Sequence, residues 1–141
     1  MSYRESKGLR EYVCRVPYDS DLLLSLKDLA SKLQVRSGWI NVFGALRKAT
    51  LLYYLQEEKR FLKNTFDGPL EIASGIGNIS TLNEDTIIHC HVVLAGKDGA
   101  CHGGHLAEGS PVFAVEVHMS ELSPPVIRKY DEQTGLNLFD I

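Results

Sequence analysis

Only one stretch of this chain has the periodicity of an amphipathic helix, and this limits the fold more than any other feature. Within residues 18–35, Leu22, Leu26, Leu29 and Leu33 recur at steps of four, three and four. That spacing places the four side chains on one side of a helix. We expect this stripe to pack into the core rather than to bind a partner.

Polar residues mark the start of the predicted helix. Asp19 or Ser20 is expected to be the N-cap, because a short polar side chain can accept a hydrogen bond from an N–H of the first turn. Asp21 is expected to add a negative charge to that turn, where the helix dipole favours it.

From Ser37-Gly38 onward the chain has the composition of strands separated by turns. Asp67-Gly68-Pro69 is expected to break one strand, and Pro124-Pro125 to close the sheet region. Including one strand before the helix, we expect strands at residues 9–16, 39–46, 49–55, 61–66, 70–80, 87–95, 100–106 and 111–122. Short strands and one early helix predict an α+β fold with a mostly antiparallel sheet.

Length and composition are those of a globular protein. The 141 residues match the usual size of one domain, and we expect residues 1–141 to form a single one. The net charge of −3 argues against non-specific nucleic-acid binding, which depends on lysine and arginine neutralising phosphates. We expect three short basic pairs to be solvated surface: Arg47–Lys48, Lys59–Arg60 and Arg128–Lys129.

The cysteines indicate a reducing compartment. Cys14, Cys90 and Cys101 are odd in number and form no C-x-x-C pair, which argues against a disulfide framework. We find no apolar run typical of a signal peptide and none long enough to span a membrane. We therefore expect a cytoplasmic protein without a membrane span.

Two histidines two positions apart are the main chemical signal. His89 and His91 lie in a predicted strand, so their side chains point to the same face, about 6.5–7 Å apart at Cα. Two imidazoles at this spacing can converge on one metal ion at bond lengths of about 2.0–2.1 Å. Cys90 faces the other way and is expected to be a core thiol. Alternatively, the two histidines are simply hydrogen-bonded on a sheet.

A third histidine favours the metal site. The turn G-K-D-G at residues 96–99 returns the chain toward the same strand, and His105 follows Gly103 and Gly104, which permit unusual dihedral angles and close backbone approach. His102 is the alternative third ligand, and His118 is expected to be a surface or core histidine. Three imidazoles without a fourth protein ligand are typical of an open metal position. Zinc is the first expectation; nickel, cobalt, copper or iron accept the same donors.

Other catalytic signatures are absent, so no catalytic residue is assigned. The chain has no P-loop, G-x-G-x-x-G, H-E-x-x-H or G-x-S-x-G motif. Glu71 is expected to be a surface or interface carboxylate. Glu71 or Asp67 would act as a base only if the fold brought one of them to the metal.

Several motifs in their order resemble the PPC (plants and prokaryotes conserved) domain, in its stand-alone prokaryotic type, which is related to the plant AT-hook nuclear proteins. They are R-S-G-W (36–39), G-A-L-R-K-A-T-L (44–51), F-D-G-P-L-E-I (66–72), H-C-H-V-V-L (89–94), G-G-H-L (103–106) and T-G-L (134–136). The resemblance implies a twisted antiparallel sheet flanked by a few helices and a homotrimer. It also implies a metal site formed by His89, His91 and His105.

The resemblance further implies a DNA-binding or regulatory module, although two features depart from the plant proteins. The chain lacks the R-G-R-P hook that enters the minor groove, and Pro69 stands where the plant proteins have an arginine. Three chains of −3 would carry −9 in a trimer. Two hypotheses follow: a DNA-associated or protein-interaction module whose metal serves assembly, or a metal-dependent enzyme or small-molecule-binding protein that uses the open metal position.

Overall fold

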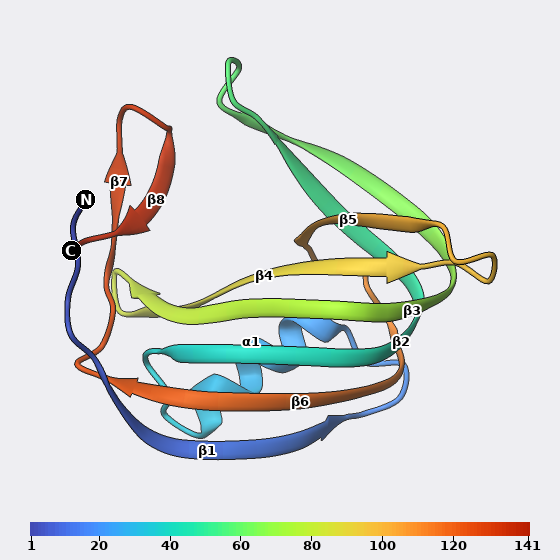
Figure 1. Cartoon of the computed structure of the whole chain (residues 1–141), viewed down its shortest axis with the longest axis horizontal. Coiled ribbons are helices and arrows are strands. Elements are labelled where there is room, and N and C mark those ends of the chain that lie inside the picture. The colour runs from blue at the N-terminus through green and yellow to red at the C-terminus, as the bar shows by residue number, and fades with distance from the viewer.

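The structure is a computed structural model that describes all residues, 1–141. Its elements are β1 (Lys7–Val16), α1 (Leu22–Lys32), β2 (Gly38–Leu55), β3 (Arg60–Leu82), β4 (Asp85–Ala95), β5 (Cys101–Leu106), β6 (Val112–Ser123), β7 (Arg128–Asp131) and β8 (Leu136–Phe139). β1 to β6 form one antiparallel sheet in the order β1-β6-β2-β3-β4-β5 (Figure 1). β5 also pairs with β2, so β2, β3, β4 and β5 form a closed, barrel-like ring.

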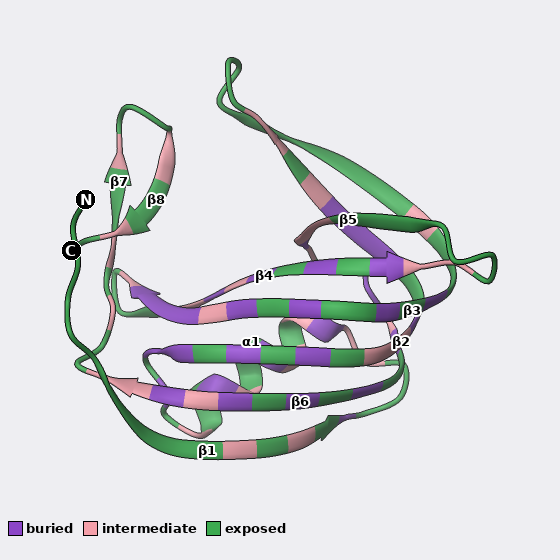
Figure 2. Cartoon of the chain, in the orientation of Figure 1, coloured by how far each residue is buried: buried purple, intermediate pink, exposed green.

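The predicted leucine stripe of α1 lies against one face of the sheet. Leu22, Leu26 and Ala30 are buried, and Leu29 and Leu33 are partly buried against the same core. Buried and exposed residues alternate along the central strands, as Figure 2 shows, so the other face of the sheet has no helix over it. No helix of the protein is both long and apolar enough to cross a membrane.

The N-cap of α1 is Asp21, not Asp19 or Ser20 as predicted. The Asp21 carboxylate accepts from Leu24 N at 3.0 Å and also from the backbone N–H groups of Gly109 and Ser110, at 2.7 and 2.9 Å. The contacts to residues 109 and 110 hold Asp21 where the helix begins, and Asp19 still has a φ of 61° in the preceding turn. The N-cap is therefore determined by contacts with a loop that is distant in the sequence. The residues around the start of the helix do not reveal such contacts.

β2 and β3 are each continuous where the sequence predicted two strands. The expected break at Asp67-Gly68-Pro69 is wrong: the pairing of β2 with β3 resumes at Lys48↔Asp67 after an irregularity between Leu46 and Lys48. Both strands bulge and bend at the same level, so the ladder changes direction instead of ending. Beyond the bend they form a two-stranded extension, the β2–β3 arm (residues 48–66), which rises from the body in Figure 1.

The six-stranded sheet ends with β6 at Ser123, just before Pro124-Pro125 as predicted, but two further strands follow these prolines. β7 and β8 pair in a separate two-stranded sheet, the C-terminal hairpin (residues 128–139). The structure contains one helix rather than a few, so the fold is mostly β and the predicted α+β class overstates its helix. Each strand of the hairpin has four residues, too short for a clear alternation in the sequence.

Candidate metal centre

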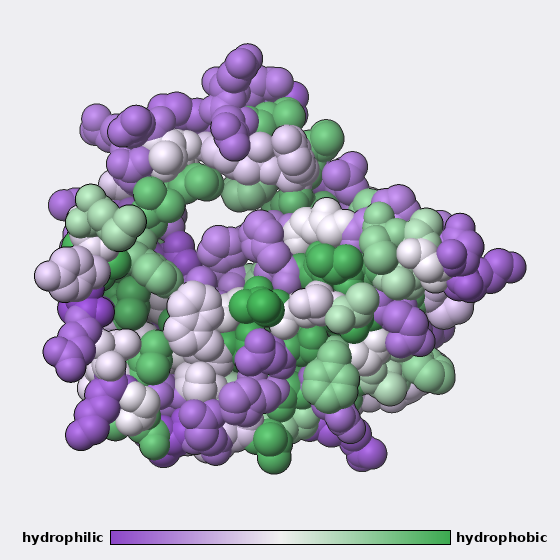
Figure 3. Space-filling view, in the orientation of Figure 1, coloured by the Kyte–Doolittle hydropathy of each residue, from purple (hydrophilic) through white to green (hydrophobic).

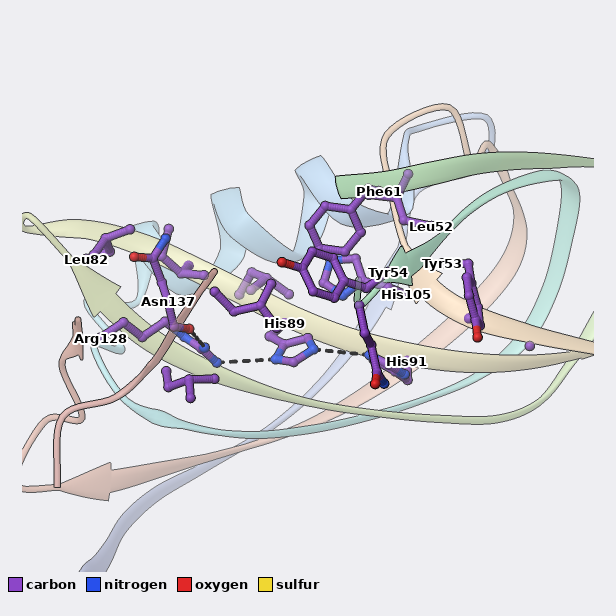
Figure 4. Close-up of a pocket in the computed structure, with 17 residues that line it drawn as sticks. Leu52, Tyr53, Tyr54, Phe61, Leu82, His89, His91, His105, Arg128 and Asn137 are labelled. Atoms are coloured by element: carbon purple, nitrogen blue, oxygen red, sulfur yellow. Dashed lines mark hydrogen bonds between the residues drawn. The ribbon is translucent and has the colours of Figure 1, made fainter. Parts of the chain in front are cut away.

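The three predicted histidines come together on the helix-free side of the sheet. His91 of β4 is paired directly with His105 of β5, and His89 lies two residues before His91 on the same face. The Nε2 atoms of His89 and His91 are 3.1 Å apart. One nitrogen from each of the three rings lies within 4.8 Å of the others, and Figure 4 shows the rings grouped at the pocket.

This arrangement fits a transition-metal ion. Tetrahedral bonds of about 2.05 Å place two coordinating nitrogens about 3.3 Å apart, close to the 3.1 Å between His89 and His91. The limit of 4.8 Å leaves only a small ring movement for His105. The same 3.1 Å also fits a hydrogen bond in which one ring donates to the other, so the metal-free protein has an alternative use for this contact.

Gly103 and Gly104 allow β5 to pack closely against its neighbours, which is one of the two effects predicted for them. A Cβ on Gly104 would lie 3.1 Å from Leu52 O, and one on Gly103 would lie 3.2 Å from Val92 O. Neither residue has a positive φ, so the expectation of unusual dihedral angles was wrong, while that of close approach is confirmed. Close packing of β5 against β2 and β4 is what brings His105 into the group.

The surroundings of His89 and His105 favour the neutral form of these two imidazoles. Burial, then the proximity of His105, Arg128 and His91, lowers the pKa of His89 to about 4. Burial also lowers the pKa of His105, with His91 and Arg128 contributing. A neutral imidazole is the form that binds a metal ion. His89 and His105 are therefore in the protonation state that metal binding requires at neutral pH.

Arg128, the first residue of β7, lies beside the histidines and was missed by the sequence analysis. Its Nη2 atom is 3.3 Å from Nδ1 of His89, as the dashed line in Figure 4 marks. Burial lowers the pKa of Arg128 from its usual value. We had treated Arg128-Lys129 as a solvated pair, which is wrong for Arg128. No sequence signal distinguished it, because the hairpin that carries it was not predicted.

A cavity of about 800 Å³ adjoins the three histidines. Its walls come from β4 and β5, the β2–β3 arm and the C-terminal hairpin, and Figure 3 shows the hollow between these parts. Nine of the 17 lining residues are hydrophobic, so most of the wall is apolar. The other eight are the three histidines, Gly103, Gly104, Gln56, Arg128 and Asn137.

Two hydrogen bonds join the arm to the hairpin beside this cavity. The hydroxyl of Tyr54 donates to the carbonyl of Thr134 at 2.7 Å, and Nζ of Lys59 donates to the carbonyl of Glu132 at 2.6 Å. Gly135 has a φ of 73°, and a Cβ there would lie 2.8 Å from the Tyr54 hydroxyl. The T-G-L segment therefore provides the close approach of the two parts. We call this pair of bonds the arm–hairpin contact.

The remaining predicted residues lie outside the cluster. His102 stacks on Phe66 with ring centroids 4.7 Å apart and is not part of the three-histidine cluster. His118 forms an exposed pair with Glu11 at 2.6 Å, which confirms a surface role. Cys90 is buried, and burial raises its pKa to about 12, as expected of a core thiol.

Neither candidate base reaches the metal centre. Glu71 and Asp67 are both exposed and are not among the residues that line the cavity. Glu71 is paired with Ala45 and Ala95 in the sheet, and Asp67 lies at the bend of β3 next to Lys48. The cavity contains no carboxylate of this chain.

Known structures share the fold, and one of them is described as a metal-containing protein. A metal-containing protein from Archaeoglobus fulgidus is 37% identical, with a TM-score of 0.92 and 99% of each chain covered. A plant- and prokaryote-conserved (PPC) protein from Pyrococcus horikoshii is 32% identical, with a TM-score of 0.93, covering 100% of this chain and 98% of that one. A candidate DNA-binding protein from Bacteroides thetaiotaomicron is 26% identical, with a TM-score of 0.88 and 96% of each chain covered. A search of curated proteins found no match.

The family is settled by a sequence match as well as by these structures. The family model of the Plants and Prokaryotes Conserved (PCC) domain matches residues 3–123. This range contains all of the sheet from β1 to β6 and the three histidines, and it leaves the C-terminal hairpin outside. The chain therefore belongs to the plants and prokaryotes conserved domain family, written PCC or PPC.

Proposed function

We propose that this protein binds a divalent metal ion, zinc in the first instance, through His89, His91 and His105, and that the ion presents an open position to the cavity for a small molecule. The observation that carries this proposal is the grouping of three ring nitrogens within 4.8 Å of one another at the wall of an 800 Å³ cavity. A volume of about 800 Å³ lies within the range of known small-molecule pockets. The metal-containing relative from Archaeoglobus fulgidus adds support.

The chemistry of the site favours binding over hydrolysis. A zinc ion with three histidine ligands supplies a Lewis acid with one free position. Hydrolytic zinc sites usually also have a carboxylate as the general base, and the cavity here has none from this chain. We therefore propose binding of a small molecule at the metal as the primary function.

Metal titration tests the site directly. We expect the purified protein, stripped of metal, to take up one zinc ion per chain in a calorimetric titration. The variant His91→Ala should lose this uptake, because two imidazoles remain, whereas His118→Ala should keep it, because His118 pairs with Glu11 on the surface. Equal zinc uptake by wild type and His91→Ala would contradict the proposal.

DNA binding is the second candidate, and relatives described as candidate DNA-binding proteins favour it. The electrostatics of this chain argue against it. The net charge is −3, and Arg47, Lys48 and Arg60 each form an ion pair with an acidic residue. A titration of duplex DNA at 20 to 200 mM salt tests it. An affinity that falls steeply with salt would support DNA binding, and we expect no measurable affinity.

We also propose that the protein forms a homotrimer through the helix-free face of the sheet. Four large apolar side chains on this face are 41–56% exposed in the single chain: Trp39, Phe43, Ile76 and Val93. Contiguous exposed apolar surface commonly marks an interface. Sedimentation analysis should give a mass near three times 15.7 kDa. Replacing Phe43 with Asp should reduce this to the mass of one chain.

A further inference from the structure

Arg128 lacks an acidic partner although it is half-buried at the cavity. Its four hydrogen-bond acceptors are all neutral: Ser80 Oγ at 2.7 Å, Asn78 Oδ1 at 2.9 Å, Asn137 O at 2.6 Å and His89 Nδ1 at 3.3 Å. None of the six ion pairs in the structure includes it. A partly buried charge without a counter-ion is unfavourable, so an anion from outside the chain would stabilise it.

The cavity as a whole also carries only positive charge. Arg128 is the one charged residue among the lining residues, which contain no Asp, Glu or Lys. With a divalent ion at the histidines the formal charge of the cavity would rise from +1 to +3, the sum of Arg128 and the ion. An anionic ligand would be attracted to this position, and a cationic one repelled.

The contact between Arg128 and His89 depends on which nitrogen of the imidazole carries the proton. A hydrogen bond from Nη2 of Arg128 requires a free lone pair on Nδ1 of His89. A neutral His89 that binds a metal through Nε2 carries its proton on Nδ1 and cannot accept this bond. Metal-bound histidines usually donate that proton to a carboxylate or carbonyl. Metal binding therefore deprives a guanidinium N–H of its acceptor.

We infer that the ligand of the cavity is an organic carboxylate with an apolar body. Its carboxylate would lie between the metal and Arg128. There it would accept the hydrogen bond from Arg128 that His89 no longer accepts once it binds the metal. Its apolar part would lie against hydrophobic lining residues such as Leu52, Phe61 and Leu136. This inference rests on the proposed metal site and adds the chemical class of the ligand.

Cobalt(II) provides the probe, because its visible spectrum reports a change of ligands at the open position. The cobalt-loaded protein would be titrated with hexanoate, with hexanamide as its uncharged equivalent and with acetate as the anion without the apolar body. We expect hexanoate to shift the cobalt spectrum and to bind at least about 10-fold more tightly than either, since it alone uses both features of the cavity.

Variants at two neighbouring positions test the role of Arg128. Arg128→Gln removes the charge in the cavity, and Lys129→Gln removes the same charge from an exposed residue that does not line it. We expect Arg128→Gln to bind cobalt and to weaken hexanoate binding about 10-fold or more, which is the range for a lost charge-assisted hydrogen bond. Lys129→Gln should match the wild type.

The outcomes separate this inference from the proposed metal site. Normal cobalt uptake with equal affinity for hexanoate and hexanamide, or with equal effects of the two glutamine variants, would overturn the carboxylate ligand and leave the metal site intact. Absence of cobalt uptake would overturn both. If Arg128→Gln does not fold, as circular dichroism would show, the comparison of hexanoate with hexanamide on the wild type still decides the question.

Discussion

β4 has two faces of opposite character. The side chains that point toward α1 are between 0% and 8% exposed, namely Ile88, Cys90, Val92 and Leu94. Those that alternate with them on the other face are His89, His91 and Val93, and they look onto the cavity or solvent. The face toward α1 is needed for folding and the other face for the proposed chemistry. Residues of the two faces alternate along the strand.

This separation allows a site to exist without weakening the core. The inner face consists of apolar groups and a thiol whose pKa is raised to about 12, so it has no charge to stabilise. The outer face concentrates polar nitrogen atoms where a cavity keeps them accessible. Substitutions on one face should therefore affect stability, and substitutions on the other should affect ligands.

The largest effect is expected from a charge on the inner face. Val92→Asp would bury a carboxylate among core residues, at a cost of several kcal/mol, against a total stability of about 5–15 kcal/mol for a typical domain. We expect this variant to be unfolded by circular dichroism. Val13 in β1 is 87% exposed on the outer face of the same sheet and is not one of the proposed trimer contacts, and Val13→Asp should cost about 1 kcal/mol or less. Similar melting curves for the two would contradict the two-face description.

The next largest effect is expected at the metal centre. His105→Ala removes one of three proposed ligands and should weaken zinc binding more than about 100-fold, beyond the loss usual for a residue that only supports a ligand. His102→Ala, on the same strand, should bind zinc like the wild type because His102 stacks on Phe66 instead. Zinc calorimetry on the two folded variants checks this. A comparable loss in both would mean that the third ligand was wrongly assigned.

A smaller effect is expected from pH on the metal-free protein. The pKa of His89 is about 4 in the folded chain and about 6.5 when unfolded. Between these values the unfolded state binds more protons, so stability should fall as pH drops from about 6.5 toward 4. Urea unfolding at several pH values measures this slope. It should be shallower in His89→Gln and unchanged in Cys90→Ala, whose native thiol does not titrate in this range.

The smallest effect is expected at the arm–hairpin contact. Tyr54→Phe removes the exposed hydrogen bond to Thr134 and should cost about 0.5 kcal/mol, the lower end of the usual range. Tyr53→Phe is the control, because its hydroxyl makes no hydrogen bond in the structure. Hydrogen exchange should show faster opening of the C-terminal hairpin in Tyr54→Phe only. Unchanged exchange rates in both would show that this bond does not hold the hairpin.

The features predicted from the sequence are those decided by neighbouring residues. The alternation along β4 predicted that His89 and His91 share a face. The turn after Ala95 predicted that His105 returns to the same strand, where it pairs with His91. The helix stripe was correct for the same reason, because periodicity is local. The family resemblance added the fold.

The features that were not predicted depend on contacts between distant parts of the chain. The true N-cap, Asp21, is fixed by residues 109 and 110. The break expected at Pro69 does not occur, because β2 bends together with β3. Arg128 reaches His89 from a hairpin 39 positions away along the chain. No periodicity within one segment contains this information.

The arm–hairpin contact ends on carbonyl groups of the main chain, at residues 132 and 134. Every amino acid has a backbone carbonyl, so replacing Glu132 with a different residue leaves the acceptor for Lys59 in place. Residue 132 can therefore change during evolution without loss of this hydrogen bond between the arm and the hairpin. The contact does depend on the side chains of its two donors, Tyr54 and Lys59, and on the absence of a side chain at Gly135. Natural variants with a more open cavity should be sought at these three positions.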